Sequence, residues 1–597
     1  MRASRAARSM LLGDAFPGPP GESQSRENVL RMMIGSERSA EFSGKGRASV
    51  LFEWLGVRSR EQALFIALGF LGVLAVGAEQ LQRVGDFRVD DAYITFSFSK
   101  NLAAGNGPVF SHGLRVEGYS NFLWMVLVAL GAWLFPGADL LTIARVGALG
   151  FLGLGLAATF GLARLAAGPF AALCAVALVV SSTDVFRAVQ SGLETVPFMS
   201  AVVFGWYVYL REPPHRRGWS LAAFLPAALL RIDGFVPVVV VIGFELARSI
   251  VERRFSPRVL LRWVLPFAVV WGAYFAWRFA YYGLLWPTPV YAKSLANALE
   301  RSRGFNQAWE FLRHVGGLAL VPWIVLAAFR VDRARPLGLL SAVSAQVAYV
   351  GLVGGDWMPF HRFFLPVLPL AAVLSVWGVK RFAHEVRLHG PLVRVGALVL
   401  VIATFVFAAQ HAHAARIDTP AEARQLAIDG EVRKHTHENL LASMDLARYV
   451  VRHPGDRFVT DYAGVFAVYT EATIIDMWGL CNADIALNGG IEHVNPIYGK
   501  GCPECYARLD PDYFHVIVPL VRSEQAFDDQ RRIIDEIFQG PAIDRVIDLE
   551  HAFTAGRVVE TATGRTFWFL ERKRPGRTFE PREPAPGIRV DYPFEPG

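Results

Sequence analysis

The stretch Val89-Asp90-Asp91-Ala92-Tyr93-Ile94 decides how this sequence is interpreted, because its two adjacent carboxylates closely follow the first long apolar segment. A carboxylate pair at the mouth of a membrane bundle is costly unless it binds a cation or moves a proton. Neighbouring side chains of a helix or strand point in different directions. We therefore expect one carboxylate to face the reacting groups, as catalytic base or metal ligand, and the other to face an arginine such as Arg88 or Arg231. A solvated loop turn is the alternative.

The composition indicates a polytopic membrane protein with a soluble part. The chain has 597 residues, of which 53% are hydrophobic and 19% charged, and its mean hydropathy is +0.32. The net charge of +7 comes largely from short basic loops between apolar runs, which report orientation in the membrane rather than nucleic-acid binding. Residues 1–60 lack the apolar core of a signal peptide and are interpreted as a disordered cytosolic tail.

About a dozen apolar runs lie between residues 63 and 409. Alternation of basic and polar loops orders them, and between residues 119 and 164 one of two runs must lie along the membrane or only dip into it. The pattern predicts a polytopic all-α membrane bundle of about eleven transmembrane helices over residues 61–410. After it, short apolar strands alternate with polar helices, which predicts an extracytoplasmic α/β domain over residues 411–597. The predicted location is the cytoplasmic (inner) membrane.

Polar residues in the predicted outward loops are candidates for substrate binding. An arginine suits a lipid phosphate, but an Arg231–Asp233 pair between two apolar runs is also a common buried salt bridge. Lys293 follows an aromatic stretch and has a membrane-surface anchor as its alternative. Glu194 opens a helix, where a negative charge is favourable in any case. The candidates are Glu117, Glu194, Arg231, Asp233, Lys293, Asp356, His361 and Arg362.

The four cysteines divide between the two predicted parts of the chain. Cys174 lies in an apolar run and is expected to be inert packing. Cys481, Cys502 and Cys505 lie in the outward domain, where a disulfide among the three is favoured over zinc or free thiols. No glycine-rich phosphate loop follows a strand, so no nucleotide is expected as a cofactor. Whether the Asp90–Asp91 pair holds a divalent metal is left open.

Five motifs together resemble the polytopic GT-C glycosyltransferases, and within them the terminal β-(1→2)-arabinofuranosyltransferase (AftB) group. They are Asp-Asp-Ala-Tyr-Ile at 90–94, Glu-Gly-Tyr-Ser-Asn-Phe-Leu-Trp at 117–124, Ser-Gly-Leu-Glu-Thr at 191–195, Gly-Gly-Asp-Trp at 354–357 and Asp-Met-Trp-Gly-Leu at 476–480. The resemblance runs from about residue 61 to 570. It departs from the family pattern at Cys481-Asn482, where Thr-Asp is expected.

The resemblance implies a GT-C-like fold and a first-loop aspartate, Asp90 or Asp91, as catalytic base. It also implies a polyprenyl-phosphate sugar as donor and a cell-envelope glycan or glycolipid as acceptor, with inverting or retaining transfer at the outer side of the lipid bilayer. Metal use varies among such enzymes. The rival hypothesis is a non-catalytic transporter or scaffold with a partner-binding outer domain, but the matching halves of a transporter are not evident in the sequence.

Overall fold

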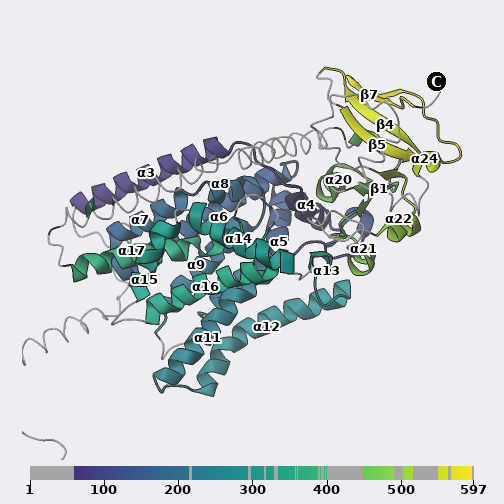
Figure 1. The fold of residues 1–597 in the computed structure, drawn as a ribbon. Coiled ribbons are helices and arrows are strands. Elements are labelled where there is room, and N and C mark those ends of the chain that lie inside the picture. The colour runs from purple at the N-terminus through teal and green to yellow at the C-terminus, as the bar shows by residue number, and fades with distance from the viewer. Residues whose placement is uncertain are drawn as a thin grey trace, which may run out of the picture. The chain divides into compact units, whose positions relative to one another are not determined.

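The computed structural model of the chain describes residues 60–213, 218–293, 298–314, 317–328, 334–356, 361–386, 448–460, 462–489, 502–514, 549–562 and 566–594, with a few single residues between them (Figure 1). The chain divides into two compact units, residues 1–63 and 64–597. All elements below belong to the second unit, apart from the first residues of α3. The predicted tail, the boundary near residue 410 and most of the apolar run 395–409 lie outside the described residues.

The first two-thirds of the described chain is helical, as its long apolar runs predict. Short 3₁₀ turns interrupt the helices at Ser111–Gly113, Ala222–Phe224, Ile232–Gly234 and Leu365–Val367. The helices are α3 (Arg60–Val84), α4 (Asp90–Ala103), α5 (Phe122–Leu134), α6 (Leu140–Ala167), α7 (Pro169–Val180), α8 (Thr183–Gln190), α9 (Thr195–Arg211), α10 (Leu225–Leu230), α11 (Phe235–Val251), α12 (Pro257–Tyr282), α13 (Thr288–Lys293), α14 (Ala298–His314), α15 (Gly317–Ala328), α16 (Ala334–Val353) and α17 (Leu368–Glu385).

Six helices in the described part of the chain are long and apolar enough to cross a membrane, or seven if α7 and α8, bent by 59°, count as one broken span. The predicted eleven crossings are therefore not reached among these residues. The reason is helix length: a bilayer core about 30 Å thick needs roughly 20 helical residues. The apolar runs that became α5, α10 and α15 form helices of 13, 6 and 12 residues. The six spans are Glu61–Val84, Leu140–Leu165, Ile232–Val251, Pro257–Tyr282, Arg335–Val353 and Leu365–Glu385.

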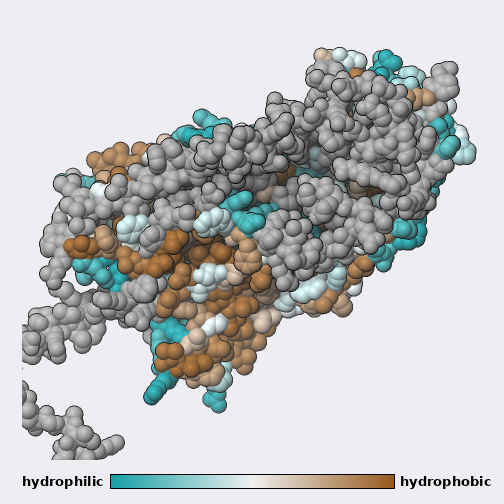
Figure 2. All heavy atoms as spheres, viewed as in Figure 1, coloured by the Kyte–Doolittle hydropathy of each residue, from teal (hydrophilic) through white to brown (hydrophobic). Residues whose placement is uncertain are grey.

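The helical part carries a broad apolar surface. Figure 2 shows hydrophobic residues gathered over the region of α11 and α12, where Val239, Leu261 and Val269 are exposed. A contiguous apolar surface of this kind is unfavourable in water and is expected of a face covered by lipid. Inside the bundle, by contrast, α9 and α17 bury most of their side chains.

The C-terminal part contains one seven-stranded mixed sheet with the strand order β2-β1-β3-β5-β4-β7-β6 (Figure 1). Strand β1 lies between β2 and β3 and pairs in parallel with both, and the later strands pair antiparallel. Among the described residues, four short helices accompany the sheet. The elements are β1 (Arg457–Thr460), α20 (Ala463–Tyr469), β2 (Thr473–Asp476), α21 (Ala483–Asn488), α22 (Pro503–Leu509), β3 (Tyr513–Phe514), α24 (Leu549–Ala552), β4 (Phe553–Glu560), β5 (Thr566–Arg572), β6 (Arg582–Ala585) and β7 (Ile588–Asp591).

The apolar residues of the strands form a buried core, which explains why these segments assemble into a sheet. One buried cluster contains an inward-facing side chain from each of four strands, namely Val459, Ile475, Phe514 and Leu570. These strands were expected from the apolar segments around residues 458, 473, 514 and 567. The C-terminal sheet domain is therefore present as predicted, and residues 515–518 of the expected third strand lie outside the described residues.

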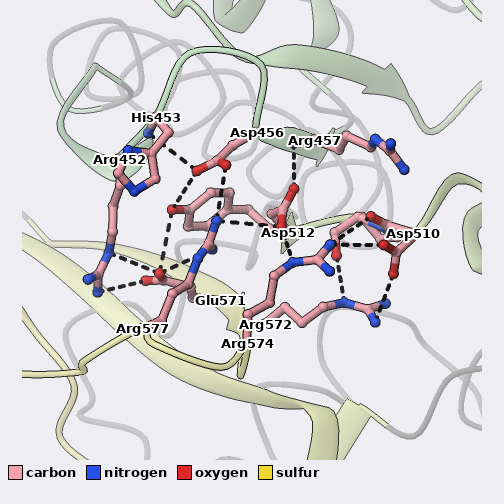
Figure 3. A network of polar contacts seen from close by, with 12 residues as sticks. Arg452, His453, Asp456, Arg457, Asp510, Asp512, Glu571, Arg572, Arg574 and Arg577 are labelled. Atoms are coloured by element: carbon pink, nitrogen blue, oxygen red, sulfur yellow. Dashed lines mark hydrogen bonds and ion pairs between the residues drawn. The ribbon is translucent and has the colours of Figure 1, made fainter.

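A network of arginines and carboxylates fastens β1, β3 and β5 together (Figure 3). Glu571, which is fully buried, pairs with Arg452 at 2.9 Å, and Arg577 reaches Asp456 at 3.0 Å. Arg574 bridges Asp510 and Asp512, as the dashed lines in Figure 3 mark. Because each of these guanidinium groups already meets a carboxylate, the network does not present an unpaired cation to a ligand.

Candidate active site at the start of helix α4

Helix α4 begins at Asp90, because Val89 before it has extended backbone. The Asp90 carboxylate accepts hydrogen bonds from the backbone N–H of Val465 at 2.8 Å and of Gly464 at 3.2 Å, both in the first turn of α20. Burial raises the pKa of Asp90 well above its usual range, and the nearby carboxylates of Asp91 and Asp476 add to the rise, against the two N–H donors. Asp90 therefore faces the sheet domain.

Asp91 points to a different neighbour. Its side chain is 21% exposed, and its carboxylate lies 3.9 Å from the Nη2 atom of Arg362, whose own side chain is 7% exposed. The supporting arginine is thus Arg362 rather than Arg88, which pairs with Asp86 at 2.6 Å. A partly exposed carboxylate beside a buried cation is free to meet a substrate hydroxyl.

Arg362 is fixed by Asp356. Its Nε and Nη2 atoms donate to the two oxygens of that carboxylate, with Nη2 at 3.0 Å from Oδ1. The turn before Asp356 needs glycine: Gly355 has φ +77°, and an added Cβ would lie 2.3 Å from Oε1 of Gln307. Gln307 in turn accepts a hydrogen bond from the backbone N–H of Asp356 at 2.7 Å. The motif Gly-Gly-Asp therefore holds the arginine that faces Asp91.

Arg231 lies between two carboxylates and two aromatic rings. Its Nη1 donates to Glu194 at 2.8 Å and its Nε to Asp233 at 2.7 Å. The rings of Phe198 and Phe363 lie 5.5 and 4.8 Å from the guanidinium carbon. This arrangement is the buried salt bridge that the sequence offered as the alternative for Arg231, and its charge is already balanced by protein groups.

Glu194 links that arginine to α4 through a polar chain. Its second oxygen accepts a hydrogen bond from Nδ2 of Asn121 at 2.8 Å, and the Asn121 amide in turn bonds the Thr95 hydroxyl at 3.0 Å. All three groups are buried. The motifs at 117–124 and 191–195 therefore meet behind the first turns of α4, which supports the position of the aspartates.

Glu117 is paired with Arg278, a residue that the sequence interpretation missed. The two side chains are 1% and 4% exposed, and Nε of Arg278 lies 3.0 Å from both oxygens of Glu117. An arginine within the apolar run 260–280 was the available signal, since a charge in such a run needs a partner. The pair fixes the loop that leads from α4 to α5.

The same loop is tied to the sheet domain through Thr288, the first residue of α13. The Thr288 hydroxyl lies 2.8 Å from the backbone oxygen of Glu117 and 2.6 Å from that of Leu480. Lys293 at the other end of α13 is exposed, and within the described part of the chain no carboxylate pairs with it. Of the candidate cations it is the one for which the described residues provide no carboxylate partner.

His361, next to Arg362 in the chain, contacts α8 instead. Its Nδ1 atom lies 2.9 Å from Oδ2 of Asp184, which also pairs with Arg187 at 2.8 Å. His361 is mostly buried, with 13% of its side chain exposed. The segment 361–362 therefore brings one imidazole and one guanidinium to this side of the bundle.

Asp476, at the end of β2, is a further carboxylate beside the aspartate pair. Its two oxygens accept hydrogen bonds from the backbone N–H groups of Cys481 at 2.7 Å and Trp478 at 3.0 Å, which closes the turn after β2. Burial raises the pKa of Asp476 to about 6, and the charge of Asp91 contributes to the rise. The sequence pointed to this motif but not to Asp476 as a site residue.

The cysteines of the sheet domain separate into a disulfide and a thiol. Cys502 and Cys505, in and just before α22, form the disulfide, while Cys481 and Cys174 are buried free thiols. Burial beside Asp476, Asp90 and Asp91 raises the pKa of the Cys481 thiol well above its usual range.

The aspartate pair does not present both side chains to one ligand. Asp90 uses both oxygens to accept backbone N–H groups, and a metal ion there would have to displace them. In the part of the chain that the structure describes, no group of three or more His, Cys, Asp and Glu side chains could hold a metal ion.

Comparison with known proteins gives one related sequence. No protein-family model matches the chain. A terminal β-(1→2)-arabinofuranosyltransferase of Mycobacterium tuberculosis (strain ATCC 25618 / H37Rv) is 29% identical over 222 residues. That match spans about a third of each protein, 35% of this chain and 35% of the relative.

Solved structures are similar at low identity. ArnT from Cupriavidus metallidurans, bound to undecaprenyl phosphate, has a TM-score of 0.48 and 14% identity over 78% of this chain and 95% of its own. The archaeal oligosaccharyltransferase AglB from Archaeoglobus fulgidus, in complex with an inhibitory peptide and a dolichol-phosphate, has a TM-score of 0.42 and 11% identity over 87% and 75%. In sequence, the chain is thus similar over about a third of its length to a terminal arabinofuranosyltransferase, as its motifs predict.

Proposed function

We propose that this protein is an integral-membrane glycosyltransferase of the GT-C type. It moves a sugar from a polyprenyl-phosphate donor to a cell-envelope glycan or lipid acceptor on the outer side of the cytoplasmic membrane. The observation that carries the proposal is the partly exposed carboxylate of Asp91 beside the buried guanidinium of Arg362 at one edge of an apolar helical bundle. The sequence similarity to an arabinofuranosyltransferase supports the reaction class.

Asp91 is the base in this proposal. The acceptor hydroxyl oxygen forms a bond to the anomeric carbon of the sugar, and the hydroxyl proton moves to Asp91. The bond between that carbon and the phosphate oxygen breaks, and its electron pair stays on the polyprenyl phosphate. The sugar is already activated by its bond to the lipid phosphate, so no soluble nucleotide takes part on that side of the membrane.

Negative charge grows on the leaving phosphate and needs a cation nearby. Arg362 uses Nε and Nη2 for Asp356, and its Nη1 has no protein partner among the described residues. Lys293 supplies a second, exposed cation. We assign these two groups to the phosphate, whereas Arg231 is held by Glu194 and Asp233. Residues 61–410 form the membrane domain, and residues 411–597 form an outer domain that binds the acceptor.

The test is transfer from a radiolabelled polyprenyl-phosphate sugar by the purified full-length protein in lipid nanodiscs. Asp91→Asn keeps the size of the side chain but cannot accept the proton, so the rate is expected to fall by about 10²–10⁴. Asp484→Asn, at an exposed carboxylate of the sheet domain paired with Arg508, is the matched control and should keep the wild-type rate. Near-normal turnover of folded Asp91→Asn protein would reject Asp91 as the base.

A further inference from the structure

Among the described residues of its own segment, helix α20 of the sheet domain has no side-chain cap. The first N–H groups of any helix lack partners within the helix, and a side chain just before it commonly accepts them. Tyr462 precedes α20 and makes no such bond, and the first intrahelical donor is the N–H of Phe466. Asp90, which is more than 370 residues away in the chain, accepts the N–H groups of Gly464 and Val465 instead.

A second contact fastens the other end of the same helix. The ammonium group of Lys100, in the last turn of α4, donates to the backbone oxygen of Val468 at 2.7 Å. Carbonyl groups in the last turn of a helix lack partners just as the first N–H groups do. α4 therefore satisfies free backbone groups of α20 at both ends, with an acid at the donor end and a base at the acceptor end.

The backbones of the two helices touch at Gly464. A Cβ atom on this glycine would lie 2.4 Å from the backbone oxygen of Asp90 and 2.5 Å from the backbone nitrogen of Ile94. These are main-chain atoms of a helix, so they cannot move aside as a flexible side chain would. A residue larger than glycine at this position must push α20 away from α4.

The contact with α20 engages the carboxyl group of Asp90 but not that of Asp91. Both oxygens of Asp90 accept N–H groups, whereas Asp91 is partly exposed and faces Arg362 at 3.9 Å. Successive helical residues project about 100° apart, so seating Asp90 on α20 sets the direction of Asp91.

We propose that Asp90 is a positioning residue, not the base: by capping α20 it docks the sheet domain onto α4 and aims Asp91 at the reacting groups. The proposal rests on the proposed glycosyl transfer for its effect on rate, while its effect on docking is independent of any activity. The Asp90→Asn variant keeps one side-chain oxygen for the closer N–H, that of Val465, and should retain docking. The Asp90→Ala variant has no side-chain oxygen for either N–H.

The experiment measures two properties of full-length protein in nanodiscs. Amide hydrogen exchange of residues 463–466 reports docking, and transfer from a polyprenyl-phosphate sugar reports activity. In Asp90→Ala we expect exchange of these amides to be about tenfold faster or more, because the N–H groups of Gly464 and Val465 lose their hydrogen bonds to the Asp90 carboxyl group and α20 is no longer held on α4. kcat should fall with it. In Asp90→Asn both changes should be small, and the acidic limb of the pH–rate profile should stay where it is in the wild type.

Gly464→Ala tests the same contact without touching a carboxylate. Alanine has a higher helix propensity than glycine, so if α20 were not docked on α4 its amides would exchange more slowly in this variant. If α20 is docked, the clash with α4 instead predicts faster amide exchange and a lower kcat. Gly150→Ala is the matched control, since a Cβ there meets no atom within 4 Å, and it should change neither property. Asp91→Asn should lose transfer but keep wild-type exchange.

Two results would overturn the proposal. One is unchanged exchange at residues 463–466 in Asp90→Ala. The other is loss of transfer in Asp90→Asn as complete as in Asp91→Asn while exchange stays normal, because Asp90 would then act on the substrate. If the wild-type protein transfers no sugar, the proposed function fails, and the exchange data still decide whether Asp90 and Gly464 dock α20.

Discussion

Removing Glu117 should destabilise the protein far more than removing a surface carboxylate. Glu117 and Arg278 are 1% and 4% exposed, and Nε of the arginine lies 3.0 Å from both carboxylate oxygens. Without Glu117, the guanidinium keeps only the backbone oxygens of Leu284 and Leu285, the latter at 2.7 Å from Nη1. An unpaired buried charge of this kind costs about 3–5 kcal/mol. We expect Glu117→Ala to lower the free energy of unfolding by that amount.

The surface pair Arg83–Glu79 supplies the control. Its side chains are 51% and 58% exposed, so Glu79→Ala should cost about 1 kcal/mol or less. A double variant, Glu117→Gln with Arg278→Met, removes both charges and should recover much of the loss. Pulse proteolysis of nanodisc-embedded protein across a urea series gives the three values.

The same variants distinguish a structural from a substrate-binding role for Glu117. The reasoning is refuted if Glu117→Ala costs no more than Glu79→Ala. If Glu117→Gln folds with wild-type stability but raises the donor KM more than tenfold, Glu117 contacts the substrate, as the sequence alone suggests.

Three further predictions concern the sheet domain. An alkaline phosphatase fused after residue 411 should be active and a GFP fused there dark, because the alternation of basic loops places this domain outside the cytoplasm; a fluorescent GFP fusion contradicts that topology. Thiol labelling of the unreduced, unfolded protein should modify Cys174 and Cys481 but not Cys502 and Cys505 until reductant is added, and labelling of all four at once would disprove the disulfide. The buried Asp476 has a pKa near 6 in the folded protein against an ordinary value of 3.8, so the folded state binds more protons between these values. Its contribution to the free energy of unfolding is most favourable below pH 3.8 and is lost as the pH rises through 6, by about 3 kcal/mol in total. Asp476→Asn should remove this pH-dependent loss of stability. Equal pH dependence of stability in wild type and variant would argue against the raised pKa.

The sequence predicted those features that depend on neighbouring residues. Apolar periodicity and length located most of the helices, and short β-branched and aromatic segments located β1, β2 and β5. Among the described residues fewer helices than predicted are long enough to cross, because hydropathy does not show where an apolar run stops being helical, as it does after 13 residues in α5. Length of helix, not apolar character, decides whether a run can cross.

The sequence did not predict which side chains far apart in the chain pair with one another. Two adjacent aspartates look alike until α20 is placed on one of them, and nothing local distinguishes Asp90 from Asp91. Arg88 seemed a natural partner for them, but it pairs with Asp86 at 2.6 Å instead. Arg278 was hidden in an apolar run, and only the fold shows that Glu117 lies against it.

The contact of Asp90 with α20 also sets the order in which this protein matures. The two partners are separated by 375 residues, so at about 5–20 residues per second the ribosome needs roughly 20–75 seconds between making Asp90 and making Val465. During that interval the side of α4 that packs on α20 has no partner, and the candidate site is incomplete. A nascent or truncated chain that stops before residue 463 therefore inserts helices without assembling the site, which leaves completion of catalysis to the last part of the chain to be synthesised.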